Sequence, residues 1–165
     1  MEKFNGKTVL ITGACGTVGS ELVRQLVKSP ATDVICLDNN ETELFFLIEQ
    51  YRASGKVTGY LADIRDREAL KLRMRGCDIV LHSAALKHVG LCEESPNQAI
   101  QTNILGTQNV IDAALDNGVE RLIFTSSDKA VNPTNVTGTS KLMGERLITA
   151  ANSLKLNHRT VFSST

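Results

Sequence analysis

The sequence of 165 residues lacks an excess of charge, a long apolar run and a secretion signal. Its 18 Lys and Arg residues balance 18 Asp and Glu residues, so the composition does not favour a surface for nucleic acid or an anionic membrane. No apolar run approaches the length of about 18 residues that a membrane span needs. The polar residues 1–7 do not form a signal peptide. We therefore expect a cytoplasmic protein with no membrane span in this chain.

Cysteine pairs and two catalytic motifs are also missing. Cys15, Cys36, Cys77 and Cys92 lie far apart and form no C-x-x-C pair. This spacing gives little support to a metal or redox site and predicts free thiols. The sequence has no G-x-S-x-G motif of a hydrolase and no Walker lysine after its glycine-rich loop. These absences argue against a Ser/His/Asp hydrolase with a nucleophile elbow and against a P-loop phosphotransferase.

Short apolar runs alternate with longer segments of helical spacing. The runs predict strands at 8–12, 33–37, 56–61, 78–82, 121–125 and 159–163. The longer segments predict helices at 18–28, 41–52, 66–73, 96–117 and 138–156. Nearly continuous apolar strands are typical of a parallel sheet that is buried on both faces. The alternation predicts an α/β fold, a Rossmann-type doubly wound parallel sheet with helices on both faces.

A glycine-rich loop joins the first strand to the first helix. Gly13 would allow the tight turn, Gly16 would let the backbone approach a pyrophosphate, and Gly19 would let the helix pack close to the strand. Thr17 and Val18 lie at the start of the helix, whose free N–H groups bind phosphate. The triplet alone is a weak signal, but its place between a strand and a helix predicts a dinucleotide site.

Asp38 ends the second predicted strand, where the fingerprint places an acid. A carboxylate there accepts hydrogen bonds from both ribose hydroxyls and repels a 2′-phosphate, so NAD is favoured over NADP. A plain loop aspartate is the alternative. Residues that follow the other strands, and Asn103 on the long helix, are expected to line the same crevice. These further candidates are Asp63, Ile64, Ala84, Ala85, Lys87, Asn103 and Ser126.

Three of these candidates have competing interpretations. Asp63 and Ile64 could meet the adenine, but an ordinary turn or capping role remains open for Asp63 and for Asn103. Lys87 fits a role in the active site about as well as a role in a surface loop.

Two segments carry the most unusual residues. They are Ala84-Ala85-Leu86-Lys87-His88 and Ser127-Asp128-Lys129-Ala130-Val131-Asn132-Pro133, the second followed by Ser140-Lys141. Together with the loop 13–19, they resemble the extended short-chain dehydrogenase/reductase superfamily. They resemble most closely the nucleotide-sugar 4,6-dehydratases of bacterial polysaccharide biosynthesis, the UDP-N-acetylglucosamine 4,6-dehydratase group. The resemblance covers the cofactor-binding half of such an enzyme.

The resemblance implies a reaction that uses NAD on a nucleotide sugar such as UDP-N-acetylglucosamine. The sugar is oxidised at C4, water is eliminated across C5 and C6, and hydride returns to C6. The resemblance implies that Lys129 removes the C5 proton and that Asp128 protonates the departing C6 hydroxyl. Ser127 would hydrogen-bond near the C4 oxygen, and Lys141 would hold the nicotinamide ribose. A dry pocket would move the pKa values of the acid and base toward neutrality, whereas a solvated turn would leave them as an exposed ion pair.

The sequence departs from the superfamily at one position. The superfamily has a catalytic Tyr four residues before the Lys, and Thr137 stands there in this chain. The spacing would put Thr137 and Lys141 on one helix face. A Thr hydroxyl cannot act as a tyrosinate, so Asp128 or Lys129 must help to remove the C4 hydroxyl proton. A membrane-anchored branch of these dehydratases also lacks the Tyr.

The length fits one domain, an NAD-binding Rossmann domain over residues 1–165. No second lobe for the substrate follows the sixth strand, so we expect a fragment whose C-terminal substrate lobe is absent. An epimerase on the same scaffold and a non-catalytic NAD-binding module remain alternatives. Dimers through paired long helices are common in the superfamily, and the identity of the sugar stays open.

Overall fold

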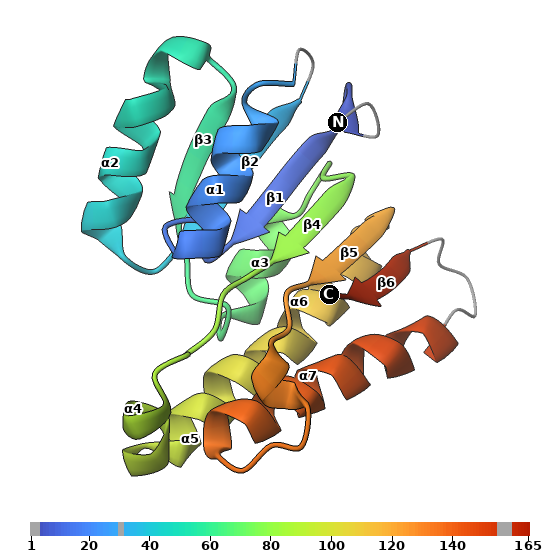
Figure 1. The fold of residues 1–165 in the computed structure, drawn as a ribbon. Coiled ribbons are helices and arrows are strands. Elements are labelled where there is room, and N and C mark those ends of the chain that lie inside the picture. The colour runs from blue at the N-terminus through green and yellow to red at the C-terminus, as the bar shows by residue number, and fades with distance from the viewer. Residues whose placement is uncertain (1–3, 30–31, 155–159) are drawn as a thin grey trace.

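The structure is a computed structural model that describes residues 4–29, 32–154 and 160–165. Six parallel strands form one sheet in the order β3-β2-β1-β4-β5-β6 (Figure 1). The strands are β1 Thr8–Thr12, β2 Asp33–Asp38, β3 Val57–Leu61, β4 Ile79–His82, β5 Arg121–Phe124 and β6 Val161–Ser164. This order confirms the predicted doubly wound sheet.

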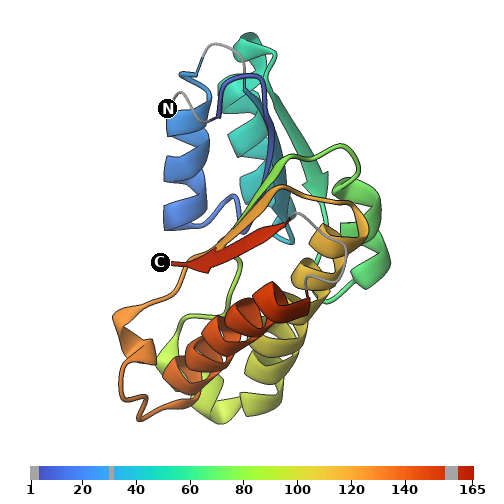
Figure 2. The same ribbon diagram turned by 90° about the vertical axis from the view of Figure 1, so that its right-hand side faces the viewer.

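Helices connect the strands and cover both faces of the sheet (Figure 2). The longer ones are α1 Thr17–Leu26, α2 Glu41–Tyr51, α3 Arg67–Arg73, α6 Thr107–Asp116 and α7 Val136–Ala151. The short ones are η2 Arg52–Ser54, α4 Val89–Glu94, α5 Pro96–Ala99, the π-helical η3 Ile100–Gly106, η4 Asp128–Ala130 and η5 Asn152–Leu154. Helices α1 and α2 pack on one face of the sheet, and α3, α6 and α7 pack on the other.

The core has two layers because successive strand side chains point to opposite faces. Val9 and Ile11 of β1 pack with the residues of α1 and α2. Leu10, between them, packs with those of α3, α6 and α7. All three side chains are fully buried. The strand therefore reads as one apolar run in the sequence.

A buried histidine joins the central strands to α6. His82 hydrogen-bonds through Nδ1 to Thr12 Oγ1 at 2.6 Å and through Nε2 to Thr107 Oγ1 at 3.1 Å. Burial, with a smaller contribution from the charge of Lys141, lowers the pKa of His82 to about 3. The neutral ring is therefore part of the core.

The chain reverses direction across the sheet at its centre. From β1 it proceeds through β2 to β3 on one side, and β4, β5 and β6 follow on the other side of β1. The loops after β1 and β4 therefore diverge, and they open a crevice at the carboxyl ends of the strands.

The predicted and observed helices differ chiefly in one division, one unexpected helix and one shifted start. The helix expected at 96–117 is divided into α5, the π-helical η3 and α6. Helix α4 was not expected, because its six residues carry no side-chain cap at His88. Helix α7 begins at Val136 rather than at 138, because Asn135 accepts a hydrogen bond of 2.8 Å from the N–H of Gly138. The predicted end of that helix, residues 155–156, and the start of the last strand, residue 159, lie outside the described residues.

Candidate functional site

An open cleft of about 380 Å³ lies at the carboxyl ends of β1 to β4. Most of the predicted cofactor residues line it. They are Gly13, Gly16, Thr17, Val18, Gly19, Asp38, Asp63, Ile64, Ala84, Ala85 and Lys87. The cleft also includes Asn39, Asn40 and Glu43, which the sequence analysis did not select. Loops from four strands therefore meet where a dinucleotide was expected.

The three glycines of the first loop have different surroundings. A Cβ atom on Gly13, whose φ is +68°, would lie 2.7 Å from the backbone of Ala84. A Cβ atom on Gly19 would lie 2.1 Å from the carbonyl oxygen of Gly13. Among the described residues, a Cβ atom on Gly16 would meet only that same oxygen, at 3.3 Å. Packing therefore explains Gly13 and Gly19, and the open backbone at Gly16 fits the approach of a pyrophosphate.

Asp38 closes one side of the cleft. Its Oδ2 accepts a hydrogen bond of 2.9 Å from the N–H of Cys15, and its Oδ1 accepts one of 3.0 Å from the N–H of Asn40. The carboxylate is thus held between the glycine loop and the start of α2. Its free lone pairs can still accept from a ribose. The carboxylate acceptor in the cleft therefore fits the ribose of a dinucleotide.

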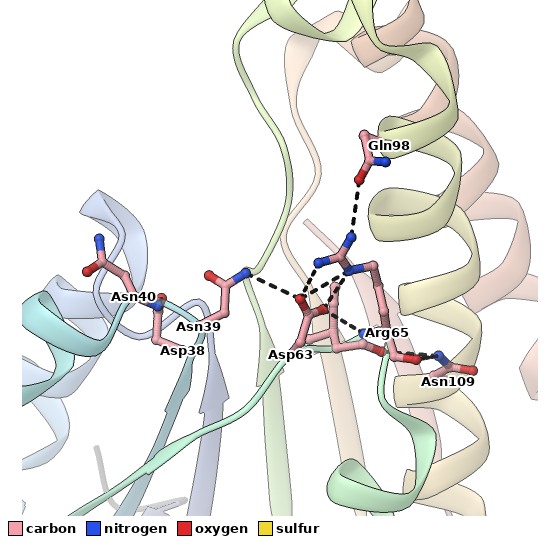
Figure 3. Close-up of polar contacts among 8 residues, drawn as sticks. Asp38, Asn39, Asn40, Asp63, Arg65, Gln98 and Asn109 are labelled. Atoms are coloured by element: carbon pink, nitrogen blue, oxygen red, sulfur yellow. Dashed lines mark hydrogen bonds and ion pairs between the residues drawn. The ribbon is translucent and has the colours of Figure 1, made fainter.

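Asp63 also lines the cleft, after the neighbouring strand β3, and forms an ion pair with Arg65 (Figure 3). The Nη2 atom of Arg65 is 2.6 Å from Asp63 Oδ2, and Nε is 3.0 Å from Oδ1. This contact lowers the pKa of the Asp63 carboxyl. Asn39 donates a longer bond of 3.4 Å to Oδ2. Sequence reasoning missed Arg65, although its place two residues after a candidate acid was visible.

Asn103 is not among the described residues that line the cleft, and its amide is used inside the protein. Oδ1 accepts from the N–H of Leu86 at 2.8 Å, while Nδ2 donates to the carbonyl oxygen of Leu86 at 3.0 Å and to Ser140 Oγ at 2.9 Å. These bonds tie the loop after β4 to α7. The structure therefore favours the structural alternative for Asn103.

The predicted catalytic residues form a separate group after β5. Ser127 Oγ donates a hydrogen bond of 2.8 Å to Asp128 Oδ1 and thereby lowers the pKa of the exposed Asp128 carboxyl. Lys129 is also exposed. The pKa of the Asp128 carboxyl thus moves away from neutrality in this structure, which fits the alternative of a solvated turn rather than that of a dry pocket. Ser126, a predicted cofactor residue, is not among the described residues that line the cleft. Its Oγ donates to Glu145 instead.

Helix α7 packs closely against this group. A Cβ atom on Gly138 would lie 2.3 Å from the carbonyl oxygen of Lys129, so the helix touches η4 directly. Lys141 is buried, and its Nζ donates to the carbonyl oxygen of Thr125 at 3.0 Å. Burial lowers the pKa of Lys141 to about 8. Thr137 is 2 % exposed, and its Oγ1 has no hydrogen-bond partner in the described part of the chain.

The described part of the chain offers neither a metal site nor a membrane span. Within residues 4–29, 32–154 and 160–165, no three His, Cys, Asp or Glu side chains gather so that they could hold a metal ion. No helix in the same ranges has the length and apolar character needed to cross a membrane. The four cysteines are free, as predicted.

Comparison with known proteins shows the family. A family described as "Polysaccharide biosynthesis protein" matches residues 9–165. The chain belongs to this family, within the extended short-chain dehydrogenase/reductase superfamily. A UDP-N-acetylglucosamine 4,6-dehydratase (inverting) of Campylobacter jejuni is 40% identical over 162 residues, which are 98% of this chain and 48% of that protein.

Two other curated proteins are similar over nearly the whole of this chain. An uncharacterized membrane protein of Methanocaldococcus jannaschii is 46% identical over 97% of this chain and 48% of its own length. A UDP-glucose 4-epimerase of Rickettsia felis is 36% identical over 98% of this chain and 48% of its own length. The chain thus spans about half the length of these relatives.

In solved structures too, the region that matches this chain is about half of a longer chain. Pen from Bacillus thuringiensis superposes with a TM-score of 0.94 at 40% identity and covers 98% of this chain and 49% of that one. The dTDP-glucose 4,6-dehydratase DesIV of Streptomyces venezuelae, solved with NAD and TYD bound, has a TM-score of 0.84 at 26% identity. That match covers 93% of this chain and 53% of DesIV.

Proposed function

We propose that this chain is the NAD-binding half of a nucleotide-sugar 4,6-dehydratase that makes precursors for polysaccharides. One observation carries the proposal. The pair Asp128 and Lys129 lies on η4, directly after β5 and against the helix that holds the buried Lys141. An acid and a base beside each other are what elimination of water needs. The Campylobacter relative, a 4,6-dehydratase by name, supports the same reaction.

The cleft would hold NAD along its length. The backbone at Gly16 and the start of α1 would bind the pyrophosphate, and Asp38 would accept from the ribose next to the adenine. Asp63 would meet the adenine, and Lys141 would lie near the nicotinamide ribose. Bound NAD supplies a hydride acceptor and donor for the sugar. The NAD named in the structures of relatives supports this choice.

Asp128 can take up a proton in one step and donate the same proton in a later step. Its pKa is lowered by the hydrogen bond from Ser127, so the carboxylate is ionised at neutral pH and can accept the C4 hydroxyl proton. The carboxylic acid thus formed can then protonate the C6 hydroxyl as it leaves. A bound sugar that excludes water would favour this acid form, because burial raises the pKa of a carboxyl. This route needs no tyrosine at position 137.

Lys129 and Lys141 would have separate tasks. Lys129 is exposed and free to turn toward the sugar, where its amine would remove the C5 proton. The C4 ketone makes that proton acidic enough for an amine base to remove. Lys141 is held by its hydrogen bond to the carbonyl oxygen of Thr125. It would therefore position the cofactor rather than transfer a proton.

A C4 epimerase is the second candidate. The Rickettsia felis relative carries that name and matches the same half. An epimerase also oxidises C4, but it needs no acid for a leaving hydroxyl at C6. The dehydratase is favoured because Asp128 can supply the proton that a leaving C6 hydroxyl needs.

Variants of the paired residues test the proposal in the longest natural protein that contains this sequence. Asp128→Asn and Lys129→Met should each lower turnover of UDP-N-acetylglucosamine by about 10²–10⁴-fold, the usual effect of losing a general acid or base. Calorimetry should show nearly unchanged NAD affinity for both. Lys7→Met is a matched control. The Lys7 amine pairs with Glu120, and Lys7 is not among the described residues that line the cleft. Normal turnover by Asp128→Asn would contradict the assignment.

A further inference from the structure

The proposed acid and base lie on a loop whose own side chains do little to fix it. Asp128 and Lys129 are both exposed. Ser127 Oγ bonds within the loop, since it donates to Asp128 Oδ1 at 2.8 Å and accepts from the N–H of Lys129 at 3.3 Å. The placement of both charged groups therefore depends on how the rest of the chain holds the two ends of this loop.

Helix α7 holds the end of the loop that follows β5. The amine of Lys141 donates to the carbonyl oxygen of Thr125 at 3.0 Å. One turn further along the helix, the carboxylate of Glu145 accepts a hydrogen bond from Ser126 Oγ. Side chains four residues apart lie on one face of a helix. Two side chains of α7 therefore bind the two consecutive residues that precede the loop.

The same helix also contacts the far end of the loop. A Cβ atom on Gly138 would lie 2.3 Å from the carbonyl oxygen of Lys129, so η4 lies directly against the start of α7 (Figure 1). Asn135 Oδ1 accepts from the N–H of Gly138 at 2.8 Å and fixes that first turn. The loop is thus attached to one helix on both sides, and Asp128 lies between the two attachments.

Ser126 is the residue at which the sheet, the helix and the loop meet. Its N–H donates to the carbonyl oxygen of Thr165, which follows β6, at 2.7 Å. Its hydroxyl donates to Glu145, and both side chains are half-buried. A hydroxyl that donates to a carboxylate forms a stronger bond than a neutral pair does. Loss of this bond would therefore let α7 and the loop shift relative to the sheet.

We propose that Glu145 is a positioning residue for the dehydration, because its hold on Ser126 sets where Asp128 and Lys129 lie relative to the sugar. Glu145 is not among the described residues that line the cleft, so it acts through Ser126. A displacement of about 1 Å at a reacting group can cost roughly 100-fold in rate. The Ser126 hydroxyl thus supports the loop rather than the cofactor. This inference rests on the proposed dehydratase function.

The test measures turnover of UDP-N-acetylglucosamine in the longest natural protein that contains this sequence. Glu145→Ala and Ser126→Ala should each lower kcat by about 10–100-fold, with KM and NAD affinity nearly unchanged. The double variant should lose no more than either single variant, since both remove the same bond. Glu145→Gln should recover most of the loss, because its amide oxygen can still accept from Ser126. The calorimetric stoichiometry of NAD counts the folded enzyme in each preparation.

Glu68→Ala is the matched control for the loss of one carboxylate. Glu68 is exposed on α3 and is not among the described residues that line the cleft, so kcat should stay at the wild-type value. Equal losses in Glu145→Gln and Glu145→Ala, or additive losses in the double variant, would overturn the inference. So would a fall in NAD affinity that matches the fall in kcat, because Glu145 would then act on the cofactor site.

The wild type separates this inference from the proposed function. A wild type that makes no dehydrated sugar would overturn both together. An active wild type whose kcat is unchanged by Glu145→Ala would overturn the role of Glu145 alone and leave the dehydratase standing.

Discussion

The Nζ atom of Lys141 donates a hydrogen bond of 3.0 Å to the carbonyl oxygen of Thr125, which fastens α7 to the residue that follows β5. The amine also lies 4.7 Å from the centre of the Phe124 ring. Burial of this amine lowers its pKa from 10.5 to about 8. The folded protein therefore holds an ammonium group that it solvates poorly at neutral pH.

The burial of Lys141 predicts that the folded protein gains stability as the pH rises from about 8 to 10.5. Below pH 8 Lys141 is charged in both states, and folding bears the full penalty of burying the charge. Between pH 8 and 10.5 only the unfolded state stays charged, so the penalty disappears as the pH rises. Lys141→Met should raise the free energy of unfolding by up to roughly 3 kcal/mol at pH 7. That difference should shrink toward pH 10.5, as measured by urea unfolding.

The comparison must be made against the wild type at each pH. Burial raises the pKa values of Cys15 and Cys36 to about 12 and that of Cys77 to about 11, so these thiols oppose the effect above pH 9. Their contribution is the same in both proteins and cancels in the difference. A difference that stays constant from pH 7 to 10.5 would show that Lys141 is not desolvated.

Thr137→Val should leave the protein equally stable or slightly more stable. The Thr137 hydroxyl is buried without a described partner, so an isosteric methyl group removes an unsatisfied polar atom. Thr107→Val is the contrasting variant, since Thr107 Oγ1 donates to the carbonyl oxygen of Asn103 at 2.7 Å and also contacts His82. It should lose about 1–3 kcal/mol. Thermal unfolding of both variants checks the order, and a larger loss at Thr137 would contradict it.

Alanine at two glycines should separate binding from folding. At Gly19 the new Cβ atom would lie 2.1 Å from the carbonyl oxygen of Gly13, so Gly19→Ala should cost about 1–3 kcal/mol of stability or more. At Gly16 the nearest atom is 3.3 Å away, so Gly16→Ala should fold nearly normally. It should nevertheless bind NAD more weakly, because the methyl group enters the cleft. Unaltered NAD affinity in Gly16→Ala would place the pyrophosphate elsewhere.

The charge of Asp38 should decide between NAD and NADP. The wild type should bind NAD more tightly, because a 2′-phosphate would face the carboxylate. Asp38→Asn keeps a carbonyl oxygen that can accept from the N–H of Cys15 but removes the charge, so the preference for NAD should narrow. Calorimetry with both dinucleotides measures the ratio. Equal affinity in the wild type would overturn the role assigned to Asp38.

The sequence predicted the sheet and the cleft because both depend on local patterns. Alternating apolar runs specify the strands, and the spacing of Gly13, Gly16 and Gly19 specifies a turn that only a few conformations satisfy. It did not predict α4 or the π-helical turn at η3, whose register depends on tertiary contacts such as those of Asn103 with Leu86 and Ser140. No local pattern shows such contacts.

The side-chain environments were harder to predict than the positions. Asp63 and Asp128 both follow strands. Asp63 forms an ion pair with Arg65, whereas Asp128 is exposed to solvent. The Asp63–Arg65 contact spans two residues, but its orientation depends on Gln98 and Asn109, which lie far along the chain. Charge and burial at a site therefore follow from the whole fold and could not be inferred from the acid alone.

The mass of the product is the most direct test of the proposed dehydratase. The longest natural protein that contains this sequence would be incubated with UDP-N-acetylglucosamine and NAD, and the products analysed by mass spectrometry. We predict a 4-keto-6-deoxy sugar nucleotide that has lost one water, and its formation should fail in Asp128→Asn. A product of unchanged mass with an inverted C4 centre would contradict the dehydratase and identify an epimerase.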